Sequence, residues 1–287
     1  MKILHSVLFL TLVFFSSLTN AVNFPSLWQS GDADLQRNLE QLLLQQDLAD
    51  AVSNYRLALT LVDITDPENP KVASVNGDKM FYAASLPKIA ILLGAFIEID
   101  SGELEPTEQL WTDMNLMIRM SNNAAATRVL DTVGRDRLLE ILQSPQYALY
   151  NPDHNGGLWV GKAYSSASAY KRDPLKNLSH GATAMQAARF YYLLETNQLV
   201  SADLTEKMKQ ILVNPGIAHK FVKGLKSVPE LALYRKSGSW KQYHADSLMV
   251  EAKGHKYIMV GLAQSWHGDQ WLEQLALPIH NMITNTQ

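Results

Sequence analysis

The sequence FYAASLPKIAILLGAFIEID, residues 81–100, decides how this chain folds. Ser85 is followed three residues later by Lys88, and residues 89–97 are apolar on nearly every side of a helix. Such a helix is buried, and residues three apart lie on one helical face. Lys88 is therefore expected to enter the core, where loss of water lowers the pKa of its amine. The pair is a candidate nucleophile and base. The structural alternative is that Ser85 caps the helix while Lys88 reaches solvent.

The same Ser-x-x-Lys spacing occurs a second time, from Ser168 to Lys171. Arg172, Asp173 and Pro174 follow that copy, and they do not continue an apolar helix. The first copy is thus the better candidate for a buried site.

Strand-like sequence lies on both sides of this helix and predicts a fold of two lobes. A hairpin precedes the helix, three β-rich runs follow near the end of the chain, and the segments between are helical by periodicity. The fold class expected is α+β, with an antiparallel sheet of about five strands, helices from both termini packed on it, and an all-helical lobe. The sheet lobe comprises about residues 22–80 and 215–287, and the helical lobe about residues 81–214. A cleft is expected where the lobes meet.

Residues 1–21 have the features of a secretory signal peptide. Lys2 precedes an apolar run over residues 3–15, and small residues at Thr19 and Ala21 suit cleavage after Ala21. An uncleaved anchor is the alternative. The chain has no cysteine, which excludes disulfides and a lipid-modified cysteine. We therefore expect an exported protein, periplasmic or secreted, without stable membrane insertion after cleavage.

The formal net charge is −3, and the basic residues are scattered. This pattern favours neither a nucleic acid nor an anionic membrane surface as a partner. It says nothing about oligomeric state.

Two further motifs are weak when taken singly. Ser121, Asn122 and Asn123 interrupt an apolar helical segment, which alone indicates a helix boundary. Lys236, Ser237 and Gly238 lie on a predicted strand, where the lysine alone would protect a sheet edge and the glycine would let another backbone or a ligand approach closely.

In the order Ser-x-x-Lys, Ser-x-Asn and Lys-Ser-Gly, the three motifs resemble those of the penicillin-interacting serine hydrolases. The resemblance extends over nearly the whole chain after residue 21 and is greatest to the class A β-lactamases. Three further segments are similar to that family: MSNNAAATRVLDTVG at 120–134, NLSHGATAMQAARFYYLL at 177–194 and YRKSGSW at 234–240.

The resemblance implies a role for each matched residue. Ser85 would form an acyl-enzyme and Lys88 would take or relay its proton, while Ser121 would pass a proton to the departing nitrogen. Asn123 would hold Lys88 and the substrate amide. Lys236 and Ser237 would bind the substrate carboxylate, and the backbone N–H groups of Ser85 and Ser239 would form the oxyanion hole. The family requires no metal or cofactor.

The chain departs from the family in the loop that carries a water-activating glutamate. The matching segment, residues 159–179, contains no glutamate, and Asp173 is its only carboxylate. Asp173 is therefore the candidate deacylation base, although it is one methylene shorter. His154 and His180 are the other candidates, each with a structural role as the alternative.

Other departures concern the shape of the cleft. Asn122 replaces the family's aspartate, and the stretch from Lys88 to Ser121 is shorter than in typical class A enzymes. The site is therefore expected to be more open. Four aromatic residues could form another wall or serve only in packing: Tyr164, Tyr170, Trp240 and Tyr243.

Three hypotheses follow for function. The first is an exported class A β-lactamase-like serine hydrolase that cleaves a β-lactam or related amide through an acyl-enzyme on Ser85. The second is a peptidoglycan DD-peptidase, amidase or esterase that β-lactams acylate without efficient turnover. The third is a non-catalytic binding or sensor module on the same fold. The ligand in each is a small β-lactam or a peptidoglycan-derived molecule.

Overall fold

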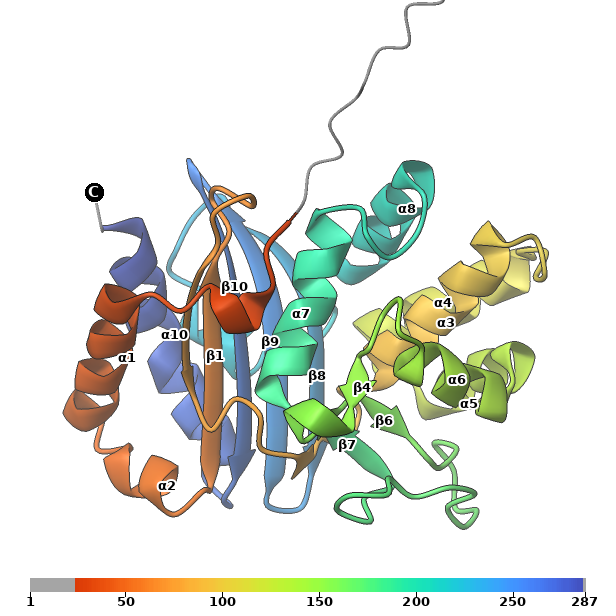
Figure 1. The fold of residues 1–287 in the computed structure, drawn as a ribbon, viewed down its shortest axis with the longest axis horizontal. Coiled ribbons are helices and arrows are strands. Elements are labelled where there is room, and N and C mark those ends of the chain that lie inside the picture. Colours follow the sequence, from red (N-terminus) through yellow and green to blue (C-terminus); the bar gives the residue numbers. More distant parts are fainter. Residues whose placement is uncertain (1–23, 286–287) are drawn as a thin grey trace, which may run out of the picture.

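A five-stranded antiparallel sheet with helices on both faces forms the centre of the protein (Figure 1). The computed structural model describes residues 24–285, so the expected signal peptide lies outside the described residues. The strand order is β2-β1-β10-β9-β8. These strands are β1 (Leu57–Asp63), β2 (Lys71–Val75), β8 (Ala232–Trp240), β9 (Tyr243–Ala252) and β10 (His255–Gln264).

Five short strands lie outside this sheet, and helices fill most of the middle of the chain. The short strands are β3 (Phe81–Tyr82), β4 (Tyr150–Asn151), β5 (Gly156–Gly157), β6 (Trp159–Val160) and β7 (His180–Ala182). The helices are η1 (Leu27–Gln29), α1 (Ala33–Gln45), α2 (Ala49–Ser53), α3 (Lys88–Asp100), α4 (Glu108–Arg119), α5 (Asn123–Val133), α6 (Arg135–Gln143), η2 (Pro152–His154), α7 (Ala184–Glu195), α8 (Ala202–Leu212), α9 (Phe221–Gly224) and α10 (Gly268–Thr284).

The two ends of the chain meet in the middle of the sheet. β1 pairs antiparallel with β10, from Leu57 opposite Ala263 to Asp63 opposite Tyr257. The hairpin β1–β2 and the run β8–β9–β10 therefore form one sheet, as the α+β prediction requires. The predicted fold class is confirmed.

Alternating residues of the central strands enter two different cores. Leu57, Leu59 and Leu61 of β1 pack with α1 and α10, whereas Ala58 and Val62 point to the opposite face with the helical lobe. Period-two alternation places neighbouring residues on opposite faces of a sheet. Because both faces are covered, β1 is apolar almost throughout, and the helical lobe is fastened to the sheet by one of the two cores.

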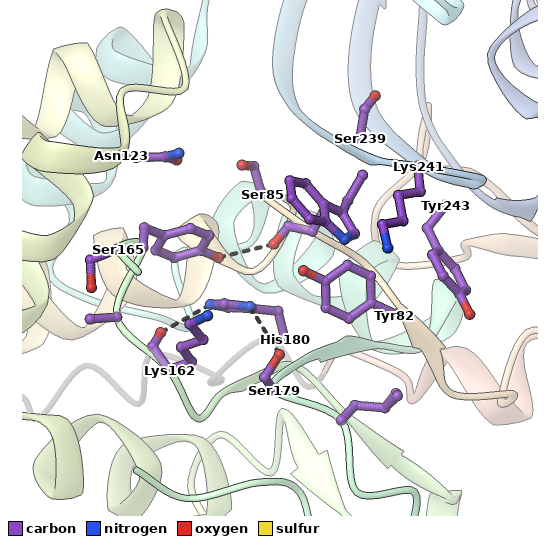
Figure 2. Close-up of a pocket in the computed structure, with 15 residues that line it drawn as sticks. Tyr82, Ser85, Asn123, Lys162, Ser165, Ser179, His180, Ser239, Lys241 and Tyr243 are labelled. Carbon is purple, nitrogen blue, oxygen red and sulfur yellow. Dashed lines mark hydrogen bonds between the residues drawn. The ribbon is translucent and has the colours of Figure 1, made fainter. Parts of the chain in front are cut away.

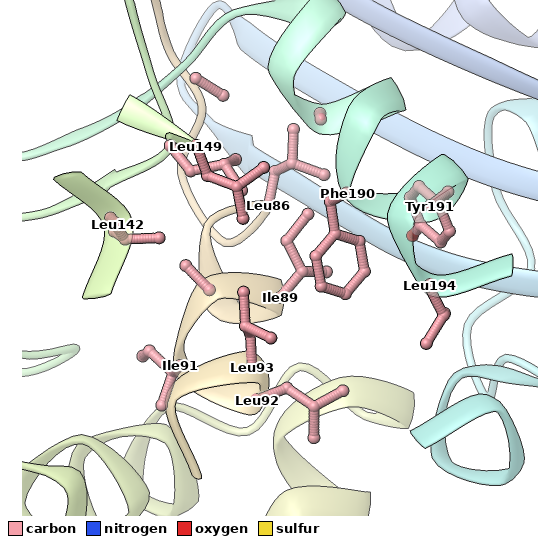
Figure 3. Close-up of a cluster of buried hydrophobic side chains, with 14 of the residues drawn as sticks. Leu86, Ile89, Ile91, Leu92, Leu93, Leu142, Leu149, Phe190, Tyr191 and Leu194 are labelled. Atoms are coloured by element: carbon pink, nitrogen blue, oxygen red, sulfur yellow. The ribbon is translucent and has the colours of Figure 1, made fainter. Parts of the chain in front are cut away.

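Helix α3 lies at the centre of the core that joins the lobes. Ile89, Leu92 and Leu93 are fully buried, and α7 contributes Phe190 and Leu194 beside them (Figure 3). Burying one such side chain typically contributes about 1.5–3 kcal/mol. This packing holds the first turn of α3, and with it Lys88, in a fixed place.

The structure divides the single helix that periodicity predicts over residues 32–52, and it confirms the helix boundary predicted at Ser121 to Asn123. Residues 32–52 form α1 and α2, because Asp47 adopts a left-handed φ of 55° between them. Residues 111–130 belong to α4 and α5, and the break falls at Ser121, whose φ is 54°. The second break presents Ser121 and Asn123 to the cleft.

Candidate active site

Ser85 lies in a tight turn between β3 and α3. Ala84 before it has a left-handed φ of 49°, and the N–H of Leu86 donates to the carbonyl of Ala83 at 3.0 Å. Left-handed backbone at a non-glycine residue is strained and often marks a functional site. The Ser85 side chain is half-buried and lines a cavity of about 570 Å³.

The amine of Lys88 is completely buried one turn further on. It donates to the Ser121 carbonyl at 2.7 Å and to Asn123 Oδ1 at 2.7 Å, and it lies 3.4 Å from Ser121 Oγ. Burial lowers the pKa of Lys88 to about 7. A substantial neutral fraction at neutral pH gives the amine the capacity to accept a proton.

The break between α4 and α5 positions the Ser-Asn-Asn motif. The side chain of Asn122 caps α5 by accepting a hydrogen bond from the N–H of Ala125 at 2.8 Å. Its two neighbours, Ser121 and Asn123, contact Lys88. Asn122 thus acts as a helix cap here, and a neutral amide is sufficient for that.

Strand β8 brings a second buried amine to Ser121. Lys236 Nζ donates to Ser121 Oγ at 3.0 Å and to the Ser237 carbonyl at 2.6 Å. Burial, and then the charge of Lys88, lower the pKa of Lys236 well below its usual range. The Ser121 hydroxyl therefore lies between two amines whose burial disfavours their charged forms.

Gly238 allows β8 to pass directly against the Ser85 turn. A Cβ at this position would lie 2.3 Å from the Ala83 carbonyl oxygen and 2.6 Å from the Ser85 nitrogen. The close approach expected of the Lys-Ser-Gly motif is present, and the approaching backbone is that of the Ser85 turn.

The remaining candidate residues lie on the same strand. Ser237 is buried, with its Oγ 3.4 Å from His219 Nε2, while Ser239 lines the cavity. Figure 2 shows Ser85 between Asn123 from the helical lobe and Ser239 from the sheet. The structure thus brings together seven of the eight sequence candidates: Ser85, Lys88, Ser121, Asn123, Lys236, Ser237 and Ser239.

Asp173 is the candidate that the structure places elsewhere. Its buried carboxylate accepts from the N–H groups of Leu175, Lys176 and Leu178 at 3.1, 3.0 and 2.6 Å, and from the Tyr150 hydroxyl at 3.1 Å. It is not among the side chains that line the cavity. These contacts fold the loop between β6 and β7, and they leave Asp173 poorly placed to activate a water at Ser85.

The β6–β7 loop places Tyr164 at the cavity, and the first residue of β7 places His180 there. His180 Nε2 is 2.9 Å from the Lys162 carbonyl, and burial lowers the pKa of His180 to about 4. Tyr164 lies against His180, with ring centroids 4.3 Å apart. His154, by contrast, stacks on Trp28 away from this cavity.

Lys220 is a buried cation at the site that the sequence did not indicate. It donates to the Gly238 carbonyl at 2.6 Å, to Ser239 Oγ at 2.8 Å and to the Ala245 carbonyl at 3.0 Å. It comes from an irregular connection before α9, where no motif or periodicity marks it. Only the folded arrangement shows that it holds the end of β8.

Aromatic side chains and lysines form the walls of the cavity. Tyr164, Trp240 and Tyr243 line it, whereas Tyr170 contacts Arg135 outside it. Lys162 and Lys241 also line the cavity, and no carboxylate does so within residues 24–285. Over the same residues, no group of three or more His, Cys, Asp or Glu side chains is arranged to hold a metal ion, and no helix is long and apolar enough to cross a membrane.

Comparisons with known proteins point to one family. The model of the Beta-lactamase enzyme family matches residues 43–113 and 110–283. The solved structure of PBP-A superposes with a TM-score of 0.68 at 16% identity, covering 92% of this chain and 100% of that one. A beta-lactamase from Sphaerobacter thermophilus superposes with a TM-score of 0.65 at 17% identity, covering 82% and 96%. A mutant of PBP-A, with a TM-score of 0.68 at 16% identity over 89% and 98%, was solved as an acyl-enzyme complex with penicillin G. No curated protein matches the chain.

Proposed function

The chain belongs to the beta-lactamase enzyme family, and we propose that it is an exported serine hydrolase that forms an acyl-enzyme on Ser85 with a β-lactam or related amide. The observation that carries this proposal is the position of the Ser121 hydroxyl, which lies 3.4 Å from the Lys88 amine and 3.0 Å from the Lys236 amine, while Gly238 brings β8 against the Ser85 turn. Three segments far apart in sequence supply these groups.

The proposed acylation step uses the neutral amine of Lys88 as base. As the Ser85 oxygen bonds to the substrate carbonyl carbon, its proton passes to the Lys88 amine. The C–N bond then breaks, and the departing nitrogen receives a proton from Ser121, which is re-protonated by Lys88 or Lys236. Proton transfers of this kind typically contribute about 10²–10⁴-fold each.

The sheet is proposed to stabilise the developing charge. The N–H groups of Ser85 and Ser239 would donate to the carbonyl oxygen, and such a donor is typically worth about 3–4 kcal/mol of the barrier. Gly238 allows β8 to lie close to the Ser85 turn, and Lys220 holds β8 by donating to the Gly238 carbonyl. Lys236 and Ser237 would bind the substrate carboxylate.

The second candidate keeps this acylation but changes the outcome. No carboxylate lines the cavity within the described residues, and Asp173 is occupied in folding its loop. This favours a peptidoglycan peptidase, amidase or esterase on which β-lactams form a long-lived adduct.

Time-resolved intact-mass spectrometry with benzylpenicillin tests the proposal. The parent protein, Ser85→Ala and Ser168→Ala are compared, because Ser168 begins the other Ser-x-x-Lys sequence and is exposed. We expect an adduct on the parent and on Ser168→Ala but not on Ser85→Ala. A short-lived adduct with accumulating hydrolysed drug supports β-lactamase activity, whereas a lasting one supports the second candidate. An unmodified parent protein would contradict both and favour a binding module.

Export has its own test. We propose cleavage after Ala21, so the protein isolated from the periplasm or medium should have an N-terminus at Val22. Recovery of the uncleaved chain in the membrane fraction would contradict it.

A further inference from the structure

Tyr164 covers the amine of Lys88 on the side of the β6–β7 loop. Lys88 Nζ lies 4.4 Å from the centroid of the Tyr164 ring, and the Tyr164 hydroxyl donates to the Ala84 carbonyl at 3.1 Å. Ala84 directly precedes Ser85, so Tyr164 contacts both the Lys88 amine and the turn that contains Ser85. Figure 2 shows Ser85 and His180 at the cavity that Tyr164 also lines.

The hydrogen-bond partners of Lys88 do not come from the β6–β7 loop. Its two short hydrogen bonds go to the Ser121 carbonyl and to Asn123 Oδ1, both in the helical lobe. Within residues 24–285 the amine has no carboxylate partner, and the loop presents only an aromatic face to it. His180 lies behind that ring, so the tyrosine is supported in place.

Hydrolysis of an acyl-enzyme needs a water molecule next to a base, and the Tyr164 ring restricts the space for such a water at Lys88. A water must add to the ester carbonyl and give a proton to a base, after which the bond to Ser85 Oγ breaks and the serine regains a proton. Lys88 is the proposed base, three residues after Ser85. The Tyr164 ring, whose centroid lies 4.4 Å from the Lys88 amine, occupies the space that a water bound to the amine from this side would need. The phenol cannot replace the base, because burial raises the pKa of Tyr164 well above its usual value.

We propose that Tyr164 shields the acyl-enzyme from water and thereby sets its lifetime. This role rests on the proposed function, because it presupposes an ester on Ser85. The site would then favour a substrate whose acyl group is kept on the enzyme long enough to be passed to an amine acceptor, as in peptide transfer. The amine nitrogen would bond to the acyl carbon, the bond from that carbon to Ser85 Oγ would break, and the proton lost by the amine would pass to the Ser85 oxygen.

The experiment measures formation and loss of the benzylpenicillin adduct separately, by intact mass, for four proteins. Tyr164→Ala removes the ring, and Tyr164→Phe keeps the ring but removes the hydrogen bond to Ala84. Tyr170→Ala is the matched control, because Tyr170 belongs to the same loop, bonds to the Val160 carbonyl and does not line the cavity.

We expect Tyr164→Ala to shorten the adduct half-life at least about tenfold, with the acylation rate within about threefold of the parent. Tyr164→Phe and Tyr170→Ala should stay within about twofold of the parent half-life. If Tyr164→Ala fails to fold, Tyr164→Leu takes its place, because a leucine side chain is smaller than the tyrosine ring. It should also shorten the adduct half-life, by a smaller factor.

Three results would overturn the proposal. A half-life unchanged by removal of the ring would show that the ring does not exclude the water. Equal shortening in Tyr170→Ala would assign the effect to a loosened loop, and equal shortening in Tyr164→Phe would assign it to the hydrogen bond. A parent protein that forms no adduct at all would instead refute the proposed function on which this role depends.

Discussion

At the scale of single residues, two buried amines share one hydroxyl. Lys88 and Lys236 both approach Ser121, and each has its pKa lowered by burial, Lys236 also by the charge of Lys88. Two ammonium groups so close, in a medium that screens charge poorly, cannot both remain protonated at little cost. Burial therefore favours a state in which at least one of the two amines is neutral and can accept a proton.

The first prediction concerns the pH dependence of acylation. In the proposed mechanism the reactive form of Lys88 is the neutral amine, and burial lowers the pKa of Lys88 to about 7. The acylation rate should therefore rise about tenfold per pH unit below this value and level off above it. Stopped-flow measurement with a chromogenic cephalosporin from pH 5.5 to 9 checks the profile.

Lys88→Arg is the matched variant for this profile, because a guanidinium stays protonated over the whole range. It should lose acylation at every pH tested. A parent rate that is flat from pH 5.5 to 8.5 would show that Lys88 is not the base.

The second prediction distinguishes a structural from a catalytic Asp173. Asp173→Asn keeps one acceptor oxygen and replaces the other by an NH2 donor, so a partly buried N–H group of the loop loses its acceptor and the free energy of unfolding should fall by about 1–3 kcal/mol. The adduct half-life should not lengthen. Chemical denaturation and intact mass measure the two effects, with exposed Asp153→Asn as control. A stable Asp173→Asn protein with a much longer-lived adduct would identify Asp173 as the deacylation base.

At the scale of elements, the site depends on the contact between β8 and the turn before α3. β8 is an edge strand of the sheet, and its free edge faces the helical lobe. Gly238 sets the separation, while Lys220 and the buried pair Arg235–Asp246 fix the strand from the other side. Removing one partner of such a buried pair typically costs about 3–5 kcal/mol.

The third prediction tests this contact. Gly238→Ala would place a methyl 2.3 Å from the Ala83 carbonyl oxygen, and the strand must move away. A shift of about 1 Å in catalytic groups can cost about 10²-fold in rate, and we expect a loss of acylation of that order. Gly31→Ala is the control, because a Cβ there meets nothing within 4 Å. Unchanged acylation in Gly238→Ala would mean that the close approach is not needed.

At the scale of the whole molecule, charge is distributed unevenly. The protein has a formal net charge of −3, yet the cavity is lined by Lys162 and Lys241 and by no carboxylate within the described residues. A concave site lined by one sign of charge concentrates substrates of the other sign. The cleft is thus suited to an anionic substrate, including one with a charge beyond the carboxylate that Lys236 would bind.

The fourth prediction compares two penicillins. One whose acyl side chain carries a second carboxylate should acylate Ser85 faster than one with a neutral side chain. The advantage should shrink as salt rises from about 0.02 to 0.5 M, because the Debye length falls to a few ångström. Lys241→Ala should also reduce the rate advantage of the penicillin with a second carboxylate, about two- to fivefold.

Lys253→Ala is the control for net charge, because Lys253 is exposed in the turn between β9 and β10, at the opposite end of β9 from Lys241. It should leave the ratio of the two rates unchanged. A ratio that is insensitive to salt in the parent would refute attraction by the cleft.

The sequence by itself determined the sheet, the buried α3 and seven candidate residues that the structure brings together, three of which line the cavity. Its signals are local: period-two alternation in β1, a wholly apolar helix after Lys88, and short motifs whose members are neighbours in the chain. The helix break at Asp47 escaped it, because a single left-handed residue does not disturb apolar periodicity, whereas the polar run from Ser121 to Asn123 did predict a boundary. Only the tertiary structure decided the rest. In the folded protein Asp173 accepts hydrogen bonds within its own loop, the Tyr164 ring lies over the Lys88 amine, and Lys220 donates to the Gly238 carbonyl of β8. Those contacts join irregular segments to residues 18 to 76 positions away or fold a loop on itself, and no periodicity records where an irregular segment will lie.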